Sequence, residues 1–249
     1  MKEENPRLFS AAFKYSIPVL LGYLAIGFAF GLLMSDAGYP WRLTVLMSVA
    51  MFAGAGQYAS IGLFAAGTSL WEAALVQLVI NARHIAYGLS MIKRMPFSGF
   101  RKAYCIFGMT DETFALLSSL PDDEEGMIHV PGLNHPIPGS CRSGFMFLVT
   151  LLNHSYWISG SLIGAVAGSL IPYNIDGIGF ALTALFIVLM LEQIFRTRKL
   201  KLKASLNVFI VSALSAVLAV IFLPSSMSLL AAITFALAVS SVMCKKGIA

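Results

Sequence analysis

Two ionisable residues, Arg83 and His84, stand together inside a long apolar stretch, QLVINARHIAYGLS at residues 77–90. An arginine at the centre of a membrane-spanning helix costs about 2.5 to 3.5 kcal/mol on the insertion scale, so it seldom faces lipid. It needs a partner or a water-filled cavity. At 100° per residue, a helix over this stretch has one polar side. That side comprises Gln77, Asn81, His84 and Gly88, with Arg83 and Tyr87 on its flank.

Two adjacent carboxylates, Asp111 and Glu112, are the expected partners of Arg83. They lie in a second apolar stretch, GMTDETFALLSS at residues 108–119. Burial favours the uncharged form of an acid, so these groups could neutralise the guanidinium, hold a substrate ammonium group or carry a proton. A plain charge pair, or a helix end near the membrane interface, is the alternative.

A third group of polar side chains occurs in TLLNHSYWISG at residues 150–160. Asn153 shares a helical face with Tyr156 and Trp157, and His154 lies close by. Because Tyr and Trp often mark the membrane interface, that role and a binding role are both open for Tyr156 and Trp157. Asn153 and His154 are the stronger candidates for binding.

The stretch MFAGAGQYAS at residues 51–60 places Gly54 and Gly56 beside Gln57 in an otherwise apolar run. This pattern favours a broken helix. Unwound backbone is allowed at membrane depth only where it is buried or lines a cavity. We therefore include Gly54, Gly56 and Gln57 among the candidate site residues.

The composition defines the kind of protein that must position these groups. Hydrophobic residues make up 58% of the 249 positions and charged residues only 12%, whereas roughly a quarter of a soluble domain is charged. Apolar stretches of about 18 to 25 residues are long enough to cross a bilayer as helices. The sequence predicts an all-α polytopic integral membrane protein with about eight segments. They are residues 16–34, 43–66, 69–92, 103–120, 143–171, 177–195, 204–223 and 226–244.

The basic residues, with a formal net charge of +5, indicate topology rather than nucleic-acid binding. With a cytoplasmic N-terminus and eight crossings, eleven basic residues fall inside. Arg42 falls outside, together with a cluster of Lys93, Arg94, Arg101 and Lys102 that does not fit the expected excess of basic residues inside. Either the membrane tolerates this cluster, or segments two and four are broken or re-entrant and do not both cross.

Small residues recur at four-residue spacing in two segments, which favours close helix packing in lipid. They are Gly27 with Gly31, and Gly160 with Gly164 and Gly168. Together with neighbouring Phe and Ala residues they hint at two repeat halves, 16–120 and 143–244, within one transporter domain at 1–249.

No metal site or disulfide framework is expected. Cys105, Cys141 and Cys244 form no paired motif, so we predict that they serve packing. His129 and His135 belong to an acidic loop, and their spacing fits no standard metal site.

Four stretches in succession carry a family resemblance: MFAGAGQYAS, INARHIAYGLS, GMTDETFAL and GIGFALTALFIVLM. In this order they resemble the AzlC family, the large subunit of bacterial branched-chain amino acid exporters. The similarity covers most of the chain; segments seven and eight carry no matching motif. The resemblance implies an inner-membrane exporter of leucine, isoleucine, valine and related amino acids such as methionine. It also implies a small membrane subunit of the AzlD type as partner.

The residues accommodate such a substrate. A zwitterionic amino acid needs a group for its carboxylate, an acceptor for its ammonium group and an apolar surface for its side chain. Arg83 could bind the carboxylate, with help from backbone N–H groups near Gly54 and Gly56. Asp111 or Glu112 could accept the ammonium group. The apolar surface could come from Met51 and Phe52.

Export against a gradient also needs an energy source. The sequence has no G-x-x-x-x-G-K-[ST] loop, so we expect no ATP hydrolysis by this chain, and we expect no cofactor. Proton coupling is the simplest alternative, with His84, Asp111, Glu112 and Glu192 as candidate carriers. Two other functions stay open. One is a membrane-embedded enzyme that acts on a lipid substrate through His84, Asp111 and Glu112, and the other is a passive channel or scaffold.

Overall fold

The computed structural model describes residues 4–95, 97–120, 127–130 and 136–170, with isolated helical positions between 187 and 239. The last three predicted segments lie mostly outside the described residues, as do Glu192, His135 and Cys244. The chain forms two compact units, one of residues 1–61 and 81–175 and one of residues 62–80 and 176–249. Every candidate site residue that is described lies in the first unit.

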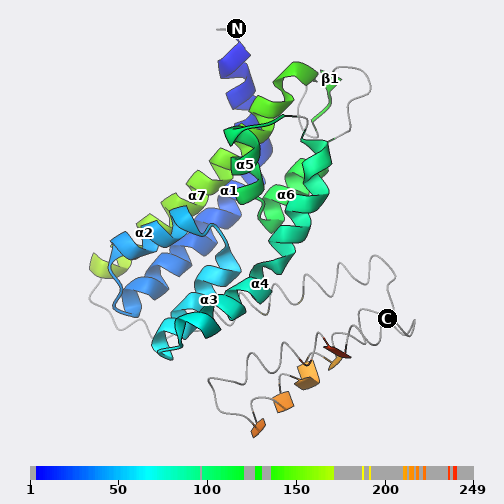
Figure 1. Ribbon diagram of the computed structural model, residues 1–249. Helices are drawn as coiled ribbons and strands as arrows, with labels where there is room; N and C mark the ends of the chain where they lie inside the picture. The colour runs from blue at the N-terminus through cyan, green and yellow to red at the C-terminus, as the bar shows by residue number, and fades with distance from the viewer. Residues whose placement is uncertain are drawn as a thin grey trace. The chain divides into compact units, whose positions relative to one another are not determined.

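Two long helices, α1 (Glu4–Asp36) and α7 (Arg142–Leu170), form the frame of the first unit. They run side by side in the same direction (Figure 1). Their contact depends on the predicted small residues. A Cβ atom at Gly31 would overlap the backbone of Ser161, and one at Gly164 would overlap the carbonyl of Phe28. The packing role predicted for these glycines is therefore confirmed, and α1 begins at Glu4 rather than at residue 16.

The second predicted segment, 43–66, is two helices, α2 (Trp41–Ala50) and α3 (Gly54–Ala65). The helix breaks at residues 51–53, where Phe52 has a φ of 35°, a backbone conformation rarely adopted by bulky residues. The Phe52 ring stacks on His154 at 4.3 Å, halfway along α7. From there α3 turns back, and the Tyr58 hydroxyl reaches the Ile26 carbonyl of α1 at 2.6 Å. The predicted segment 43–66 is therefore a helical hairpin, in agreement with the broken-helix alternative.

The fourth predicted segment, 103–120, is broken in the same way into α5 (Phe100–Phe107) and α6 (Asp111–Ser118). At the break, a Cβ on Gly108 would overlap the methyl group of Thr150 on α7, so a larger residue would displace the Thr150 side chain. Thr110 caps α6, since its hydroxyl accepts the Thr113 N–H at 3.3 Å. The end of α6 lies against the N-terminal half of α1, where the Tyr15 hydroxyl donates to the Leu116 carbonyl. This second hairpin therefore approaches from the opposite end of α1 to the first.

The third predicted segment, 69–92, is one continuous helix, α4 (Leu70–Met91), followed by the short helix η1 (Ile92–Arg94). Among the described residues, two helical stretches are long and apolar enough to cross a membrane, Arg7–Asp36 and Leu70–Arg94. The chain departs from purely helical structure between α6 and α7. There β1 (Met127–Ile128) pairs antiparallel with β2 (Ile137–Pro138), and η2 (Gly139–Cys141) leads into α7. The short ladder was not predicted.

The basic cluster has a structural role at helix ends. The Arg94 guanidinium donates to the carbonyls of Ser118 and Leu120, both at 2.6 Å, where α6 ends. The Lys102 ammonium donates to carbonyls of Ile92 and Met95 at 3.1 and 3.2 Å. Cations at these positions satisfy carbonyl groups that have no partner within the helix.

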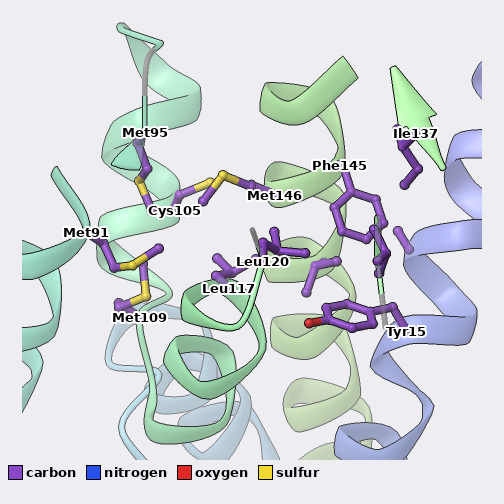
Figure 2. Close-up of a cluster of buried hydrophobic side chains, with 13 residues drawn as sticks. Tyr15, Met91, Met95, Cys105, Met109, Leu117, Leu120, Ile137, Phe145 and Met146 are labelled. Atoms are coloured by element: carbon purple, nitrogen blue, oxygen red, sulfur yellow. The ribbon is translucent and has the colours of Figure 1, made fainter. Parts of the chain in front are cut away.

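The second hairpin packs on a sulfur-rich core. Figure 2 shows methionine side chains and Cys105 meeting between α4, α5 and α7, with Leu117 and Leu120 beside them. Methionine is flexible and polarizable, so it fills irregular gaps and tolerates rearrangement of its neighbours. Cys105 is buried, as its predicted packing role requires. The methionines of the core are Met91, Met95, Met109 and Met146.

Candidate functional site

An ion pair joins α4 to the break of the second hairpin. Arg83 Nη1 lies 2.8 Å from Asp111 Oδ2, and the Tyr87 hydroxyl donates to Asp111 Oδ1 at 2.6 Å. Arg83 and Tyr87 are four residues apart on α4 and therefore face the same way. The two charged side chains are 30% and 29% exposed, so they lie neither in the core nor on an open surface. Tyr87 is fixed in turn by stacking on Phe114 at 4.4 Å.

The neighbouring acid, Glu112, has a different partner. Its Oε2 is hydrogen bonded to the Tyr23 hydroxyl of α1 at 2.7 Å. The same hydroxyl lies 2.6 Å from Thr110 Oγ1. Of the two acids named as partners for Arg83, Asp111 therefore takes the ion pair, and Glu112, the next residue of α6, contacts α1.

Asn153 of α7 completes this polar group from a third helix. Its Nδ2 donates to Thr113 Oγ1 at 3.0 Å, and Thr110 Oγ1 donates to the same oxygen at 3.0 Å. Asn153 is fully buried, and its Oδ1 has no hydrogen-bond partner among the described residues. Hydroxyl and amide groups from α1, α6 and α7 therefore meet beside the break of the second hairpin.

The first hairpin is held to α7 by a separate set of bonds. Trp157 Nε1 donates to Gln57 Oε1 at 2.7 Å, and Gln57 Nε2 donates to Ser48 Oγ at 3.2 Å. His154 Nε2 contacts the Ser48 carbonyl at 3.1 Å, and its Nδ1 is hydrogen bonded to the Tyr104 hydroxyl of α5 at 2.8 Å. Because one histidine ring links α2 to α5, the middle of α7 joins both breaks.

Not all predicted residues come together. Arg83, Tyr87 and Asp111 are in direct contact. The His84 ring lies 6.1 Å from the Tyr87 ring and, within the described part of the chain, makes no hydrogen bond to either acid. Asn81 lies on α4, about one turn from His84. The flank of the predicted polar stripe, rather than the stripe itself, faces Asp111.

Gly54 packs against the ring of Trp157, and Gly56 and Gln57 are buried in the first turns of α3. Phe52 is 2% exposed, because His154 and Tyr23 cover its ring. It therefore helps to join the hairpin breaks and offers little free surface to a ligand.

The sequence prediction missed Tyr23 and undervalued Trp157. Tyr156 and Trp157 are buried against α1 and α3, where each makes a hydrogen bond inside the protein. A signal was present: a tyrosine hydroxyl in the middle of an apolar helix needs a hydrogen-bond partner. The sequence alone could not show which partner that is.

Two broken helices that meet between long apolar helices, with polar side chains turned inward, are features of membrane transporters. The chain belongs to the AzlC family: residues 18–171 match the family described as AzlC protein. No solved structure matches the chain.

Three relatives illustrate the family. The branched-chain amino acid transport protein AzlC of Bacillus subtilis is 35% identical over 192 residues, which cover 77% of this chain and 70% of that protein. An uncharacterized membrane protein of Helicobacter pylori is 40% identical over 191 residues, covering 77% and 78%. The inner membrane protein YgaZ of Escherichia coli is 31% identical over 208 residues, covering 80% and 78%. The chain is therefore a helical membrane protein, and its family supports a transport function.

Proposed function

We propose that this protein exports branched-chain amino acids, leucine, isoleucine and valine and also methionine, across the bacterial inner membrane. A small AzlD-type membrane subunit is its partner, and a proton gradient supplies the energy. The observation that carries the proposal is the partly exposed pair of Arg83 and Asp111 at the break of a helix. The similarity to the B. subtilis transport protein supports the substrate class.

The ion pair matches the two charges of an amino acid. Without substrate, the guanidinium and the carboxylate neutralise each other, so neither charge is left unpaired at membrane depth. A zwitterion that enters between them gives its carboxylate to Arg83 and its ammonium group to Asp111. The planar guanidinium suits a carboxylate because it can donate two parallel hydrogen bonds. The Tyr87 hydroxyl keeps Asp111 oriented during the exchange.

An apolar surface lies next to the pair. Phe114 follows Asp111 on α6 and stacks on Tyr87, which contacts Asp111 directly. Its ring is a better candidate for contact with a branched side chain than Phe52, which other rings cover. The backbone N–H groups at Gly54 and Gly56 are proposed as further donors to the substrate carboxylate.

The two hairpins support a topology with a cytoplasmic N-terminus. If neither hairpin crosses, α4 returns the chain to the side on which α1 began. Lys93, Arg94, Arg101 and Lys102 are then cytoplasmic, and Arg42 stays outside. This arrangement agrees better with the excess of basic residues in cytoplasmic loops than eight full crossings do, because eight crossings place all four residues of the cluster outside.

Uptake of labelled leucine by inverted membrane vesicles tests the proposal. Inverted vesicles present the cytoplasmic face outward, so export appears as uptake. When a proton gradient is applied, vesicles with the wild-type protein should accumulate leucine, and the leucine recovered should be chemically unaltered. Arg83→Ala should abolish this uptake. Arg42→Ala is the matched control, because it removes an exposed cation outside the site.

Three results would contradict the proposal: uptake by Arg83→Ala at the wild-type rate, equilibration without accumulation, or recovery of chemically altered substrate. Equilibration alone would favour the passive channel, and altered substrate would favour the enzyme.

A further inference from the structure

Glu112 stands in surroundings that suit a proton carrier. Asp111 is neutralised by Arg83, whereas Glu112 makes no ion pair within the described part of the chain. Its Oε2 contacts the Tyr23 hydroxyl instead. Three ionisable groups of the described residues interact with Glu112: Tyr23 on α1 through a hydrogen bond, and Arg83 on α4 and Asp111 on α6 through their charges. The nearby α7 side chain in this network is the neutral amide of Asn153.

A continuous chain of hydrogen bonds leads away from this carboxyl group. Glu112 Oε2 lies 2.7 Å from the Tyr23 hydroxyl, which lies 2.6 Å from Thr110 Oγ1. Thr110 Oγ1 lies 3.0 Å from Thr113 Oγ1, which lies 3.0 Å from Asn153 Nδ2. The chain links α1 to the capping residue of α6 and then to α7. Three of its members carry hydroxyl groups, each able both to donate and to accept.

The hydrogen bonds from Glu112 to Asn153 can be arranged in two ways, depending on whether Glu112 is ionised or protonated. Tyr23 has one hydroxyl proton and two oxygen neighbours, so it donates to one of them and accepts from the other. When Glu112 is ionised, Tyr23 donates to the carboxylate and Thr110 donates to Tyr23. When Glu112 is protonated, it donates to Tyr23, Tyr23 donates to Thr110, and Thr110 donates to Thr113. In the structure the Thr110–Thr113 bond has the direction of the protonated arrangement, and the Tyr23–Glu112 bond has that of the ionised one.

Asn153 can end this series of hydrogen bonds whichever way the hydroxyl groups donate. Its amide offers a donor at one end and an acceptor at the other. Nδ2 is bonded to Thr113, while Oδ1 is buried and has no partner among the described residues. Turning the amide would present Oδ1 to Thr113. Both proton arrangements can thus end on the same side chain.

On the basis of the proposed export function, we propose that Glu112 carries the driving proton, while Asp111 serves the amino acid. The proton enters from the outer side, binds to a Glu112 oxygen and leaves to the cytoplasm as the amino acid moves outward. Each binding and release reverses the hydroxyl chain at Thr110, the residue that caps α6. The state of Glu112 is thereby transmitted to the break of the second hairpin, beside the Arg83–Asp111 pair.

Two transport assays on the full-length chain separate this role from substrate binding. The first measures exchange of labelled for unlabelled leucine at equal concentrations without a pH gradient. The second measures accumulation driven by a pH gradient. In Glu112→Gln the side chain keeps its shape and can still form hydrogen bonds, but it cannot bind or release a proton. It therefore imitates protonated Glu112 permanently. We expect it to exchange leucine as the wild type does and to lose accumulation, whereas Asp111→Asn loses both.

Each outcome decides between the alternatives. Accumulation by Glu112→Gln at the wild-type level overturns the inference, as does loss of exchange by this variant when it is recovered folded. If Glu112→Gln is not recovered from membranes, Tyr23→Phe replaces it, because it interrupts the hydroxyl chain but keeps the ring. Tyr23→Phe should retain exchange and lose most of the accumulation, and wild-type accumulation would contradict the inference. Failure of the wild type to exchange leucine would contradict the export function itself.

Discussion

Gln57 shows how one buried side chain holds a break in place. Both ends of its amide are bonded, to Trp157 and to Ser48, and the residue is fully buried. Removing one partner of a buried hydrogen bond leaves the other unsatisfied, at a cost of about 1 to 3 kcal/mol. Bonds of this kind stabilise the first hairpin against α7, although the backbone at Phe52 is strained.

We predict that Trp157→Phe lowers the thermal unfolding temperature of the purified protein, because it leaves the Gln57 carbonyl without its donor. The loss of stability should be about 1 to 3 kcal/mol, to which the lost ring volume adds. The measurement is thermal unfolding in detergent. Trp41→Phe is the control, since Trp41 is exposed. Equal unfolding temperatures for the two variants would show that the bond to Gln57 does not stabilise the break.

We predict that Tyr87→Phe weakens leucine transport less than Arg83→Ala does. The ring still stacks on Phe114, but Asp111 loses a hydroxyl donor and keeps Arg83 as its side-chain partner among the described residues. Loss of one hydrogen bond to a charged group corresponds to about 1.5 to 3 kcal/mol, or roughly a 10- to 150-fold change in apparent affinity. The apparent KM for leucine measures it. An unchanged KM would mean that Tyr87 does not orient Asp111 for the substrate.

Residue chemistry was the part best predicted from the sequence. An arginine in an apolar helix demands a counter-charge, and the acids at 111 and 112 were the available ones. Which of the two acids pairs with Arg83 was not predictable, because it depends on how α6 is rotated between α1 and α4. The contacts of Tyr23 and Trp157 were missed for a related reason: a tyrosine or tryptophan in an apolar run fits the membrane interface and the protein interior equally well.

At the scale of elements, the contact between α1 and α7 sets where both hairpins can dock. Gly27 and Gly31 on α1 meet the backbone of α7, and the glycines of α7 meet the backbone of α1. Small residues allow this approach in lipid, where no hydrophobic force drives helices together. The two helix breaks pack against α7 at three of its side chains, Thr150, His154 and Trp157.

We predict that Gly31→Ala greatly reduces the yield of folded protein, whereas Gly22→Ala does not. A Cβ at Gly31 overlaps the backbone of α7, which cannot move without separating the helices. A Cβ at Gly22, on the same helix, meets no atom within 4 Å. The yield of monodisperse protein in detergent is the readout. A similar yield for both variants would contradict the observed helix contact.

The breaks illustrate what a sequence pattern shows and omits. Gly54, Gly56 and Gln57 predicted an interruption in the first hairpin, and the structure confirms it at residues 51–53. The second break has a weaker signal, because Gly108 alone precedes the Thr110 cap. Neither pattern shows that the chain turns back, since hydropathy measures the length of a segment and not its direction.

At the scale of the whole molecule, the hairpins change the expected topology. If α2–α3 and α5–α6 each return to the side from which they came, as we propose, the loops at 37 and 98 lie on opposite sides of the membrane. Eight full crossings would place both loops outside. The basic residues favour the first arrangement.

We predict that a cysteine at position 98 is cytoplasmic and one at position 37 is external. Ser98 and Ala37 are exposed, so each is replaced by cysteine in turn. Cys141→Ser and Cys244→Ser remove two native thiols that the reagent could otherwise label. A membrane-impermeant maleimide applied to intact cells should label the second position, and label the first only after permeabilisation. Labelling of both in intact cells would support eight crossings.

Binding of labelled leucine to the purified protein tests the central claim most directly, namely that Arg83 and Asp111 receive the two ends of an amino acid. Wild-type binding should be displaced by isoleucine and valine. It should not be displaced by 3-methylbutylamine, which lacks the carboxylate, or by 4-methylpentanoate, which lacks the ammonium group. Arg83→Ala should bind leucine at least about tenfold more weakly. Leucine binding by Arg83→Ala with wild-type affinity would contradict the account.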